Sequence, residues 1–290
     1  MIKSIRMLSK DEVAKTATSD WHDCGLGGYE FDLPSLKEKT IEFKPGVNII
    51  VGKNGCGKTS LLNVIRKLTM CDGSFSSHYS RGHGEARLHR IQNAGYFRRA
   101  DLSMDYRFSV FNLRKPGDME SYDWESSAAN FSQFFNAKSR SDGQNVNETL
   151  KMMIVFFMFG EEDYKAQDVK KGKNGRDFEK CVIEPVRNAA KNCKTHQFML
   201  DYYERNGFKA KKDDPYYGWT MLFDEPDKGL DVFKVKELFD IITRDGDEKL
   251  IQKIVVLHNI GLIHKLRKWG KANFIDIDNG YLEEVDRFFE

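Results

Sequence analysis

A glycine-rich stretch holds the residues best suited to chemistry. Residues 52–59 read GKNGCGKT, which matches the pattern G-x-x-x-x-G-K-T. In such a loop the backbone N–H groups surround an anion, the lysine reaches the outer phosphates of a nucleotide, and the threonine hydroxyl can hold Mg²⁺. The pattern therefore predicts a nucleotide-phosphate site. The residues expected to line it are Gly52, Asn54, Gly55, Cys56, Gly57, Lys58, Thr59 and Ser60.

Two carboxylates at the end of an apolar run form the second chemical feature. Asp224 and Glu225 follow the apolar residues 219–223 and precede Pro226. Because α/β sheets bind ligands at the carboxyl edge of their strands, both side chains are predicted to face the phosphates. Asp224 is placed to support Mg²⁺, directly or through water, and Glu225 to polarise the attacking water as a general base. The alternative is an exposed acidic turn before the proline.

Alternating strands and helices must position these residues. Apolar runs and period-two alternation predict strands at 40–43, 47–51, 87–91, 106–113, 219–223 and 251–257. Helical periodicity predicts helices at 58–68, 145–159, 178–205, 231–243 and 260–269. Residues 272–285 resemble a hairpin that turns at Asp278-Asn279-Gly280. The alternation indicates an α/β domain with a mainly parallel core sheet.

Composition indicates a globular protein of the cytoplasm. The chain has 290 residues, of which 40% are hydrophobic and 31% charged, and its net charge of +2 favours no class of partner. The longest apolar run, residues 152–159, is too short to span a bilayer, and the first residues do not resemble a signal peptide. Five scattered cysteines without CxxC spacing favour reduced thiols over disulfides or a zinc site.

Three motifs in order resemble the ATP-binding-cassette (ABC) ATPase superfamily. They are the loop at 52–59, the segment DEPDKGLD at 224–231, and VVLHN at 255–259. The resemblance implies a P-loop NTPase fold with one ABC-type domain over residues 1–290. It also implies an antiparallel N-terminal subdomain and a helical insertion in addition to the mainly parallel sheet. ATP and Mg²⁺ are the cofactors that it implies.

The resemblance also assigns roles to single residues. Glu225 corresponds to the catalytic base. His258, 33 residues further on, corresponds to a histidine that senses the γ-phosphate. Asp231 ends the segment that crosses to the partner subunit, because members of this superfamily dimerise around two ATP molecules.

The superfamily also places a signature turn against the ATP of the partner subunit. The candidate is the stretch 140–144, in which Ser141, Gly143 and Gln144 would make the contacts. Asp142 departs from the pattern, because a negative charge close to a phosphate is repelled unless it points away. An ordinary helix cap is the alternative interpretation of this turn.

Spacing between the motifs separates the branches of the superfamily. Gln144 lies 80 residues before Asp224, further than in transporter cassettes, and Ser141 lies only 83 residues after Lys58, with no heptads between them. What remains resembles compact ATPases related to RecF, to SMC proteins and to the ATPase halves of OLD-type nucleases. We expect a helical signature subdomain at about 118–160 and a basic insertion at about 160–215.

Three further sets of residues have open assignments. Gln92 or Gln133 is expected to contact Mg²⁺ and the γ-phosphate, with Gln92 preferred, and Tyr29 or Phe31 would stack on adenine or belong to the core. Seven arginines between 81 and 114 could contact a phosphate backbone or form a solvated face. They are Arg81, Arg87, Arg90, Arg98, Arg99, Arg107 and Arg114.

These observations lead to one expected function and two alternatives. The expected function is that of a soluble ABC-type ATPase whose homodimer closes on ATP and acts on DNA or an effector protein, as in repair or phage defence. The first alternative is the nucleotide-binding subunit of a membrane transporter. The second is a small-molecule kinase, which the pair of Glu225 and His258 fits poorly.

Overall fold

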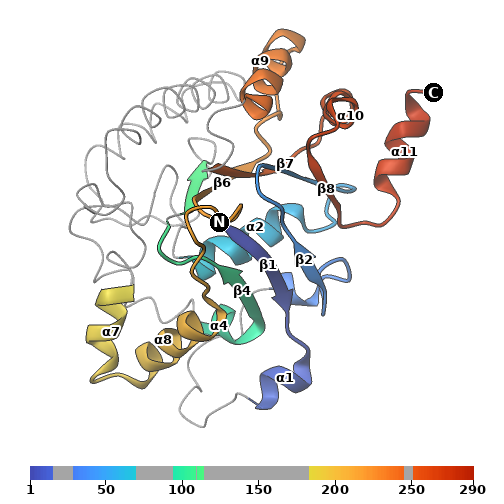
Figure 1. Ribbon diagram of the computed structural model, residues 1–290. Coiled ribbons are helices and arrows are strands. Elements are labelled where there is room, and N and C mark those ends of the chain that lie inside the picture. The colour runs from blue at the N-terminus through green and yellow to red at the C-terminus, as the bar shows by residue number, and fades with distance from the viewer. Residues whose placement is uncertain (16–28, 70–93, 109, 114–182, 245–250) are drawn as a thin grey trace, which may run out of the picture.

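Two sheets organise the chain (Figure 1), and the computed structural model describes residues 1–15, 29–69, 94–108, 110–113, 183–244 and 251–290. The larger sheet has five strands in the order β5-β6-β7-β3-β8, and all of its pairings are parallel. Its strands are β3 (Val47–Val51), β5 (Val110–Leu113), β6 (Trp219–Asp224), β7 (Ile251–Val256) and β8 (Asn273–Asp276). The mainly parallel core predicted from the sequence is confirmed.

Strands at the centre of this sheet are apolar on both faces. Ile49 and Val51 of β3 pack on one face, whereas Ile50, between them, packs on the other. Residues of β6 and β7 alternate in the same way, because successive side chains of a strand point to opposite faces. Strands buried on both sides read as continuous apolar runs, which is why the sequence identified them.

Three of the described helices cover one face of the parallel sheet. They are α9 (Val232–Thr243), α10 (Ile260–Trp269) and α11 (Tyr281–Phe288). In Figure 1, α9 and α10 lie above the sheet, and their apolar residues, such as Leu238 and Leu262, pack against Met221 and Val255. Among the described residues, this layer forms one of the two hydrophobic clusters.

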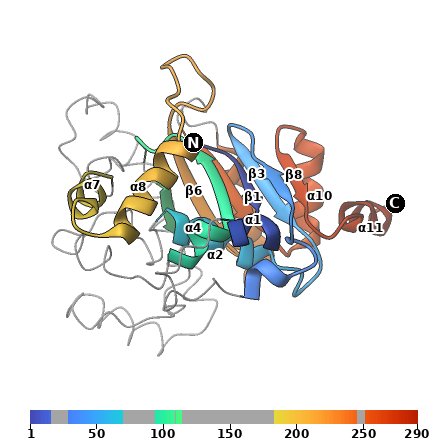
Figure 2. The ribbon, with the colours of Figure 1, turned by 90° about the horizontal axis from the view of Figure 1, so that it is seen from below.

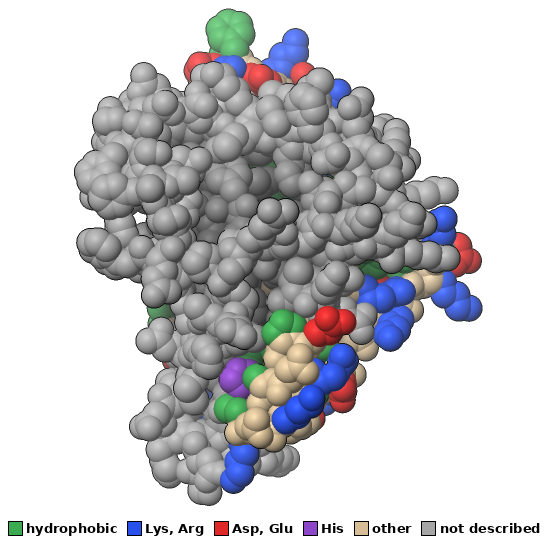
Figure 3. Space-filling view, turned by 90° about the vertical axis from the view of Figure 1, so that its left-hand side faces the viewer, with side chains coloured by type: hydrophobic (Ala, Val, Ile, Leu, Met, Phe, Trp, Pro, Cys, Tyr) green, Lys and Arg blue, Asp and Glu red, His purple; other side chains and the backbone are tan. Residues whose placement is uncertain are grey.

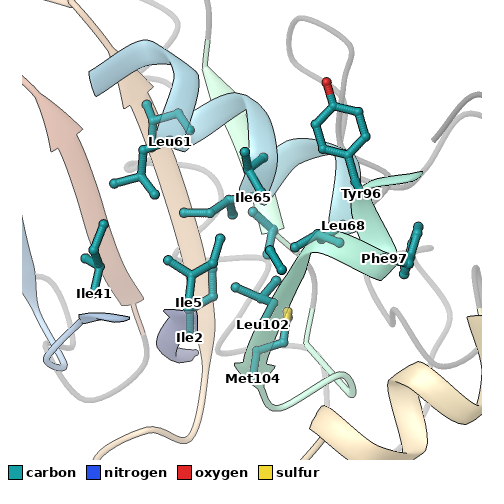
Figure 4. Close-up of a cluster of buried hydrophobic side chains, with 14 of the residues drawn as sticks. Ile2, Ile5, Ile41, Leu61, Ile65, Leu68, Tyr96, Phe97, Leu102 and Met104 are labelled. Carbon is teal, nitrogen blue, oxygen red and sulfur yellow. The ribbon is translucent and has the colours of Figure 1, made fainter. Parts of the chain in front are cut away.

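The opposite face carries α2 (Lys58–Leu68) and the smaller sheet. That sheet has the order β2-β1-β4 and is antiparallel, with strands β1 (Ile2–Met7), β2 (Thr40–Glu42) and β4 (Ala100–Met104). Figure 4 shows Leu61, Ile65 and Leu68 of α2 directed toward Ile2 and Ile5 of β1. The phosphate loop therefore leads into a helix that is held between two sheets.

A buried amide connects the two sheets. Gln252 of β7 is fully buried, and its Oε1 accepts the backbone N–H of Ile2 at 2.9 Å and the hydroxyl of Thr220 at 2.8 Å. Its Nε2 donates to the carbonyl oxygens of Ile2 and Lys44 at 2.8 and 2.9 Å. Both ends of the amide are thus satisfied, as a buried polar group requires.

Four short helices and one longer helix complete the described fold. They are α1 (Lys10–Lys15), the 3₁₀ helix η2 (Tyr29–Asp32), α4 (Ala94–Arg99), α7 (Glu184–Ala190) and α8 (Lys194–Asn206). Figure 2, seen from below, shows α7 and α8 on one side of the molecule and α11 on the other. Buried Tyr202 of α8 ties this helix to β4, because its hydroxyl accepts the N–H of Leu102 at 2.8 Å and donates to the carbonyl of Ala100 at 3.0 Å.

The predicted hairpin at 272–285 is wrong. The first half forms β8, which pairs in parallel with β3, and the second half forms α11. The turn residues Asp-Asn-Gly lead into a helix because the carboxylate of Asp276 accepts the N–H groups of Gly280 and Leu282 at its start. Tyr281, Leu282 and Val285 then lie at helical spacing on the face that joins the core.

Two other predicted elements differ at their ends. The described part of the predicted helix at 178–205 is two helices, because Cys193 has an extended backbone between α7 and α8. The predicted strand at 106–113 is shorter, since the N–H of Phe108 donates to the carbonyl of Asp105 in a turn before β5 begins. The strand predicted at 87–91 and the helix predicted at 145–159 lie outside the described residues.

Candidate functional site

The phosphate loop joins the end of β3 to the start of α2, as its motif predicts. Gly52, Gly55 and Gly57 have φ values of +151°, +78° and +102°, which side chains rarely adopt. A Cβ atom on Gly57 would lie 2.9 Å from Cδ1 of Leu33, whereas one on Gly55 would meet nothing within 4 Å. The three glycines therefore allow the backbone shape of the loop, and Gly57 also allows close packing against Leu33.

Lys58 is folded over its own loop. Its side chain is buried, and Nζ donates to the carbonyl oxygens of Gly52 at 2.7 Å and Lys53 at 2.9 Å. The hydroxyl of Ser35 donates to a further loop carbonyl, that of Cys56. The loop carbonyls are thereby turned to internal donors, and the ammonium group lies at the N-terminus of α2, where anions bind.

Asp224 and Thr59, which were predicted from the sequence to hold Mg²⁺, meet across the site. Oγ1 of Thr59 donates to Oδ1 of Asp224 at 3.0 Å. The other carboxylate oxygen, Oδ2, receives Nη2 of Arg66 at 3.0 Å, and Nη1 of Arg66 donates to Asn63 at 2.7 Å. Both oxygens of Asp224 therefore have a fixed donor.

Sequence reasoning missed Arg66. Its side chain is only 1% exposed, although it is a charged residue on a helix. A signal was available, because Arg66 follows Thr59 by seven residues and so lies on the same face of α2. A charge on that face needs a buried partner, and the acidic strand end was a candidate.

Glu225 adopts a left-handed backbone conformation with φ +49°, immediately after β6. Its Oε1 lies 2.7 Å from Nε2 of His258, and its Oε2 lies 3.2 Å from Nζ of Lys228. The hydrogen bond from His258, together with that from Lys228, lowers the pKa of Glu225 to about 2. The carboxylate is therefore ionised throughout the neutral range.

A second missed residue, Asp227, connects the two strand ends. Its Oδ2 accepts the backbone N–H of His258 at 2.7 Å and that of Asn259. Asp227 is 4% exposed, and burial raises its pKa. Its Oδ1 has no hydrogen-bond partner among the described residues. This carboxylate fixes the backbone that carries His258.

Asp231 caps α9. Its side chain accepts the N–H groups of Phe233 and Lys234 at 2.9 and 3.0 Å, a cap that the sequence did not predict. The two residues that follow Asp231 are exposed apolar side chains: Val232 is 74% exposed and Phe233 81%. The predicted position of Asp231 at a subunit interface stays a prediction.

Tyr29 and Phe31 differ in their surroundings. Phe31 is buried and packs against Tyr96, with ring centroids 5.5 Å apart, so it belongs to the core. Tyr29 is 68% exposed, and its hydroxyl lies 3.4 Å from Oγ of Ser60 at the start of α2. Of the two aromatic candidates, Tyr29 is the one that a nucleotide base could reach.

Several predicted site residues lie outside the described residues. These are Gln92, Gln133, Ser141, Asp142, Gly143 and Gln144. Three of the seven clustered arginines are described, and they contact the fold itself. Arg98 is buried, Arg99 lies over the ring of Phe31 at 4.6 Å, and Arg107 pairs with Asp105 at 2.5 Å.

The hydroxyl of Thr59 and the carboxylate of Asp224 fit Mg²⁺. No group of three His, Cys, Asp or Glu side chains in the described residues could hold a metal by itself. Mg²⁺ does not need such a group, because it binds through one or two protein oxygens together with water and phosphate oxygens. Thr59 and Asp224, 3.0 Å apart beside the phosphate loop, provide that set.

A parallel sheet that carries a phosphate loop after one strand and paired carboxylates after another, with a single strand between the two, defines a P-loop NTPase. Comparison with known families agrees. A family model described as an AAA domain matches residues 31–268, and the chain belongs to this family of P-loop ATPases. A search of curated proteins found no match. In the part of the chain that the structure describes, no helix has the length and apolar character needed to cross a membrane.

Proposed function

We propose that this protein binds ATP with Mg²⁺ at the loop 52–59 and hydrolyses it with the help of Glu225, as a compact ABC-type ATPase of the RecF-like branch. One observation supports this most strongly. The adjacent residues Asp224 and Glu225 each contact a different group of the site, Thr59 at 3.0 Å and His258 at 2.7 Å. A strand end with a metal-supporting carboxylate followed by a water-orienting one suits phosphoanhydride hydrolysis.

Each side chain has a distinct task in this proposal. Lys58 binds the β- and γ-phosphates, and Thr59 with Asp224 holds Mg²⁺, which neutralises phosphate charge when bound. Glu225 orients the attacking water through a hydrogen bond. Its carboxylate, which is ionised at neutral pH, is also placed to accept a proton from that water as a general base. His258 holds Glu225 and is placed to sense the γ-phosphate.

The proposal includes dimerisation on ATP. Ser141, Gly143 and Gln144 of one copy would contact the ATP of the other, and Asp231 would lie in the segment that crosses between them. The exposed side chains of Val232 and Phe233, directly after Asp231, support a contact there. Closure on ATP and opening after hydrolysis would act on DNA or an effector protein, as in repair or phage defence.

Some support for a polyanionic partner comes from the surface of α7 and α8. Arg187, Lys191 and Lys194 are exposed there. Figure 3 shows Lys and Arg side chains gathered on that part of the molecule, with acidic side chains among them. The mixture favours weak, salt-dependent binding over a dedicated groove.

Phosphate release from ATP tests the hydrolysis. We expect Glu225→Gln to lower turnover by about 10²- to 10⁴-fold while the affinity for ATP with Mg²⁺ is kept. Glu204→Gln is the matched control, because Glu204 is an exposed acidic residue of α8. Equal turnover of wild type and Glu225→Gln would refute the role of Glu225.

Light scattering tests the dimer. Glu225→Gln with ATP and Mg²⁺ is expected to double in mass, because closure persists without hydrolysis, whereas the same protein with ADP is expected to be monomeric. A protein that stays monomeric with ATP contradicts the dimer model. If double-stranded DNA neither binds in low salt nor changes the ATPase rate, the DNA version of the proposal fails.

A further inference from the structure

We propose that Arg66 is a positioning residue that holds Asp224 in place and thereby strengthens Mg²⁺ binding with the nucleotide. This proposal rests on the ATP and Mg²⁺ site proposed above. It extends that site to a residue of α2, the helix that follows the loop. The proposal is based on two side-chain hydrogen bonds to the carboxylate of Asp224, one donated by Arg66 and one donated by Thr59.

The geometry gives each oxygen of Asp224 a separate donor. Nη2 of Arg66 lies 3.0 Å from Oδ2, and Oγ1 of Thr59 lies 3.0 Å from Oδ1. The guanidinium is planar, and its second nitrogen, Nη1, donates to Asn63 at 2.7 Å. Arg66 is therefore held at two points, and the orientation of the Asp224 carboxylate is fixed from behind.

This orientation determines what Thr59 can do. A hydroxyl that donates its proton to Oδ1 of Asp224 keeps its own lone pairs for another partner. Those lone pairs are what a cation beside the phosphates would use. Because Oδ2 is occupied by Arg66, Oδ1 is the oxygen of Asp224 that is left to orient Thr59.

The ion pair between Arg66 and Asp224 is largely shielded from solvent. The side chain of Arg66 is 1% exposed and that of Asp224 is 12% exposed, so solvent screens the pair only weakly. Without the guanidinium, Asp224 keeps its charge but loses the contact that fixes its rotamer. Residues that orient metal ligands in this way typically change metal affinity by about 10- to 100-fold when they are removed.

The test measures a fluorescent ATP analogue bound to the full chain, once with Mg²⁺ and once with EDTA. The ratio of the two dissociation constants gives the Mg²⁺-dependent gain in affinity. We expect Arg66→Met to lower this gain by about 10- to 100-fold. The affinity in EDTA should stay unchanged, because Lys58 and the loop backbone are intact. Binding of Mn²⁺ to the ATP complex, followed by electron paramagnetic resonance, should weaken by the same factor.

Two conservative variants separate positioning from folding. Arg66→Lys keeps the positive charge but cannot reach Asp224 and Asn63 together, so the gain should fall by a smaller factor, about tenfold or less. Asn63→Ala keeps the pair with Asp224 and should retain most of the gain. As a control, Arg205→Met removes an exposed arginine that pairs with Asp101, and it should leave the gain unchanged.

The outcomes are decisive. A wild-type gain in Arg66→Met, or in Arg66→Lys if the Met variant does not fold, would overturn the role of Arg66. A larger gain would also overturn it, because Asp224 would then bind the ion better when released. A wild-type protein that binds ATP equally well with Mg²⁺ and with EDTA would instead refute the proposed Mg²⁺ function itself.

Discussion

Nε2 of His258 lies 2.7 Å from Oε1 of Glu225, so the ends of β6 and β7 are joined by side chains as well as by strand pairing. The two residues are 33 positions apart in the sequence. Their contact depends on the parallel register of the strands, which pairs Asp224 with Val256. The side chains that follow these two residues therefore meet at the carboxyl edge of the sheet.

This pair makes stability depend on pH. The pKa of Glu225 is about 2 in the folded protein, below the ordinary value of 4.5. The contribution of the pair is therefore fully present above pH 4.5 and is lost as pH falls through about 2. We expect Glu225→Gln to lower the free energy of unfolding near neutral pH, and the difference from wild type to shrink as the pH is lowered.

Urea denaturation at a series of pH values measures this difference. His258→Ala removes the first partner of Glu225 and should reproduce the same trend. The double variant should lose less unfolding free energy than the sum of the losses in the two single variants, because both substitutions remove the same interaction. A difference between wild type and Glu225→Gln that is constant with pH would contradict the prediction.

His258→Ala should also affect hydrolysis. We expect turnover to fall by about 100-fold, because Glu225 loses the group that orients it, while ATP affinity changes by a smaller factor. His264→Ala is the control, because His264 stacks on Phe289 between α10 and α11, away from the strand ends. Phosphate release at saturating ATP and nucleotide titration separate the two effects, and a loss of affinity with unchanged turnover would assign His258 to binding alone.

Substitutions of Asp227 should distinguish its charge from its shape. Asp227→Ala leaves the N–H groups of His258 and Asn259 without an acceptor, at a cost of about 1–3 kcal/mol each. Asp227→Asn keeps one oxygen for both N–H groups and removes a buried charge, but it puts an NH2 group at the buried position of Oδ1, which has no partner among the described residues, so it should cost less than Asp227→Ala. Chemical denaturation measures the unfolding free energy of both variants. A larger loss in Asp227→Asn than in Asp227→Ala would refute this account.

Two glycines of the phosphate loop offer a matched comparison. Both have positive φ, but a Cβ at Gly57 would lie 2.9 Å from Leu33, whereas one at Gly55 has free space. Gly55→Ala should cost about 1–2 kcal/mol from backbone strain alone. Gly57→Ala should cost about 1 kcal/mol more, because its neighbours must shift. Denaturation without nucleotide checks the order of the two, which equal losses would contradict.

The local parts of the site were predictable from the sequence, whereas its long-range contacts were not. Glycine spacing, an apolar strand and a helical period located the loop at 52–59 and the carboxylates at 224 and 225, because these signals lie within a few residues. Arg66 and Asp227 were missed because their roles depend on which elements pack together. The turn at Asp278-Asn279-Gly280 misled for a related reason, since the same residues can start a hairpin or a helix.

The side-chain amide of Gln252 affects how the protein unfolds locally. It is bonded to β1 through both the N–H and the carbonyl of Ile2, and to β6 through Thr220. If β1 detached, the amide of Gln252 would stay buried without its hydrogen bonds to Ile2. Local opening of the antiparallel sheet is therefore disfavoured. Amide hydrogens in β1 and β7 should therefore exchange with a similar free energy, as one cooperative unit. In Gln252→Leu, the hydrogens of β1 should exchange first.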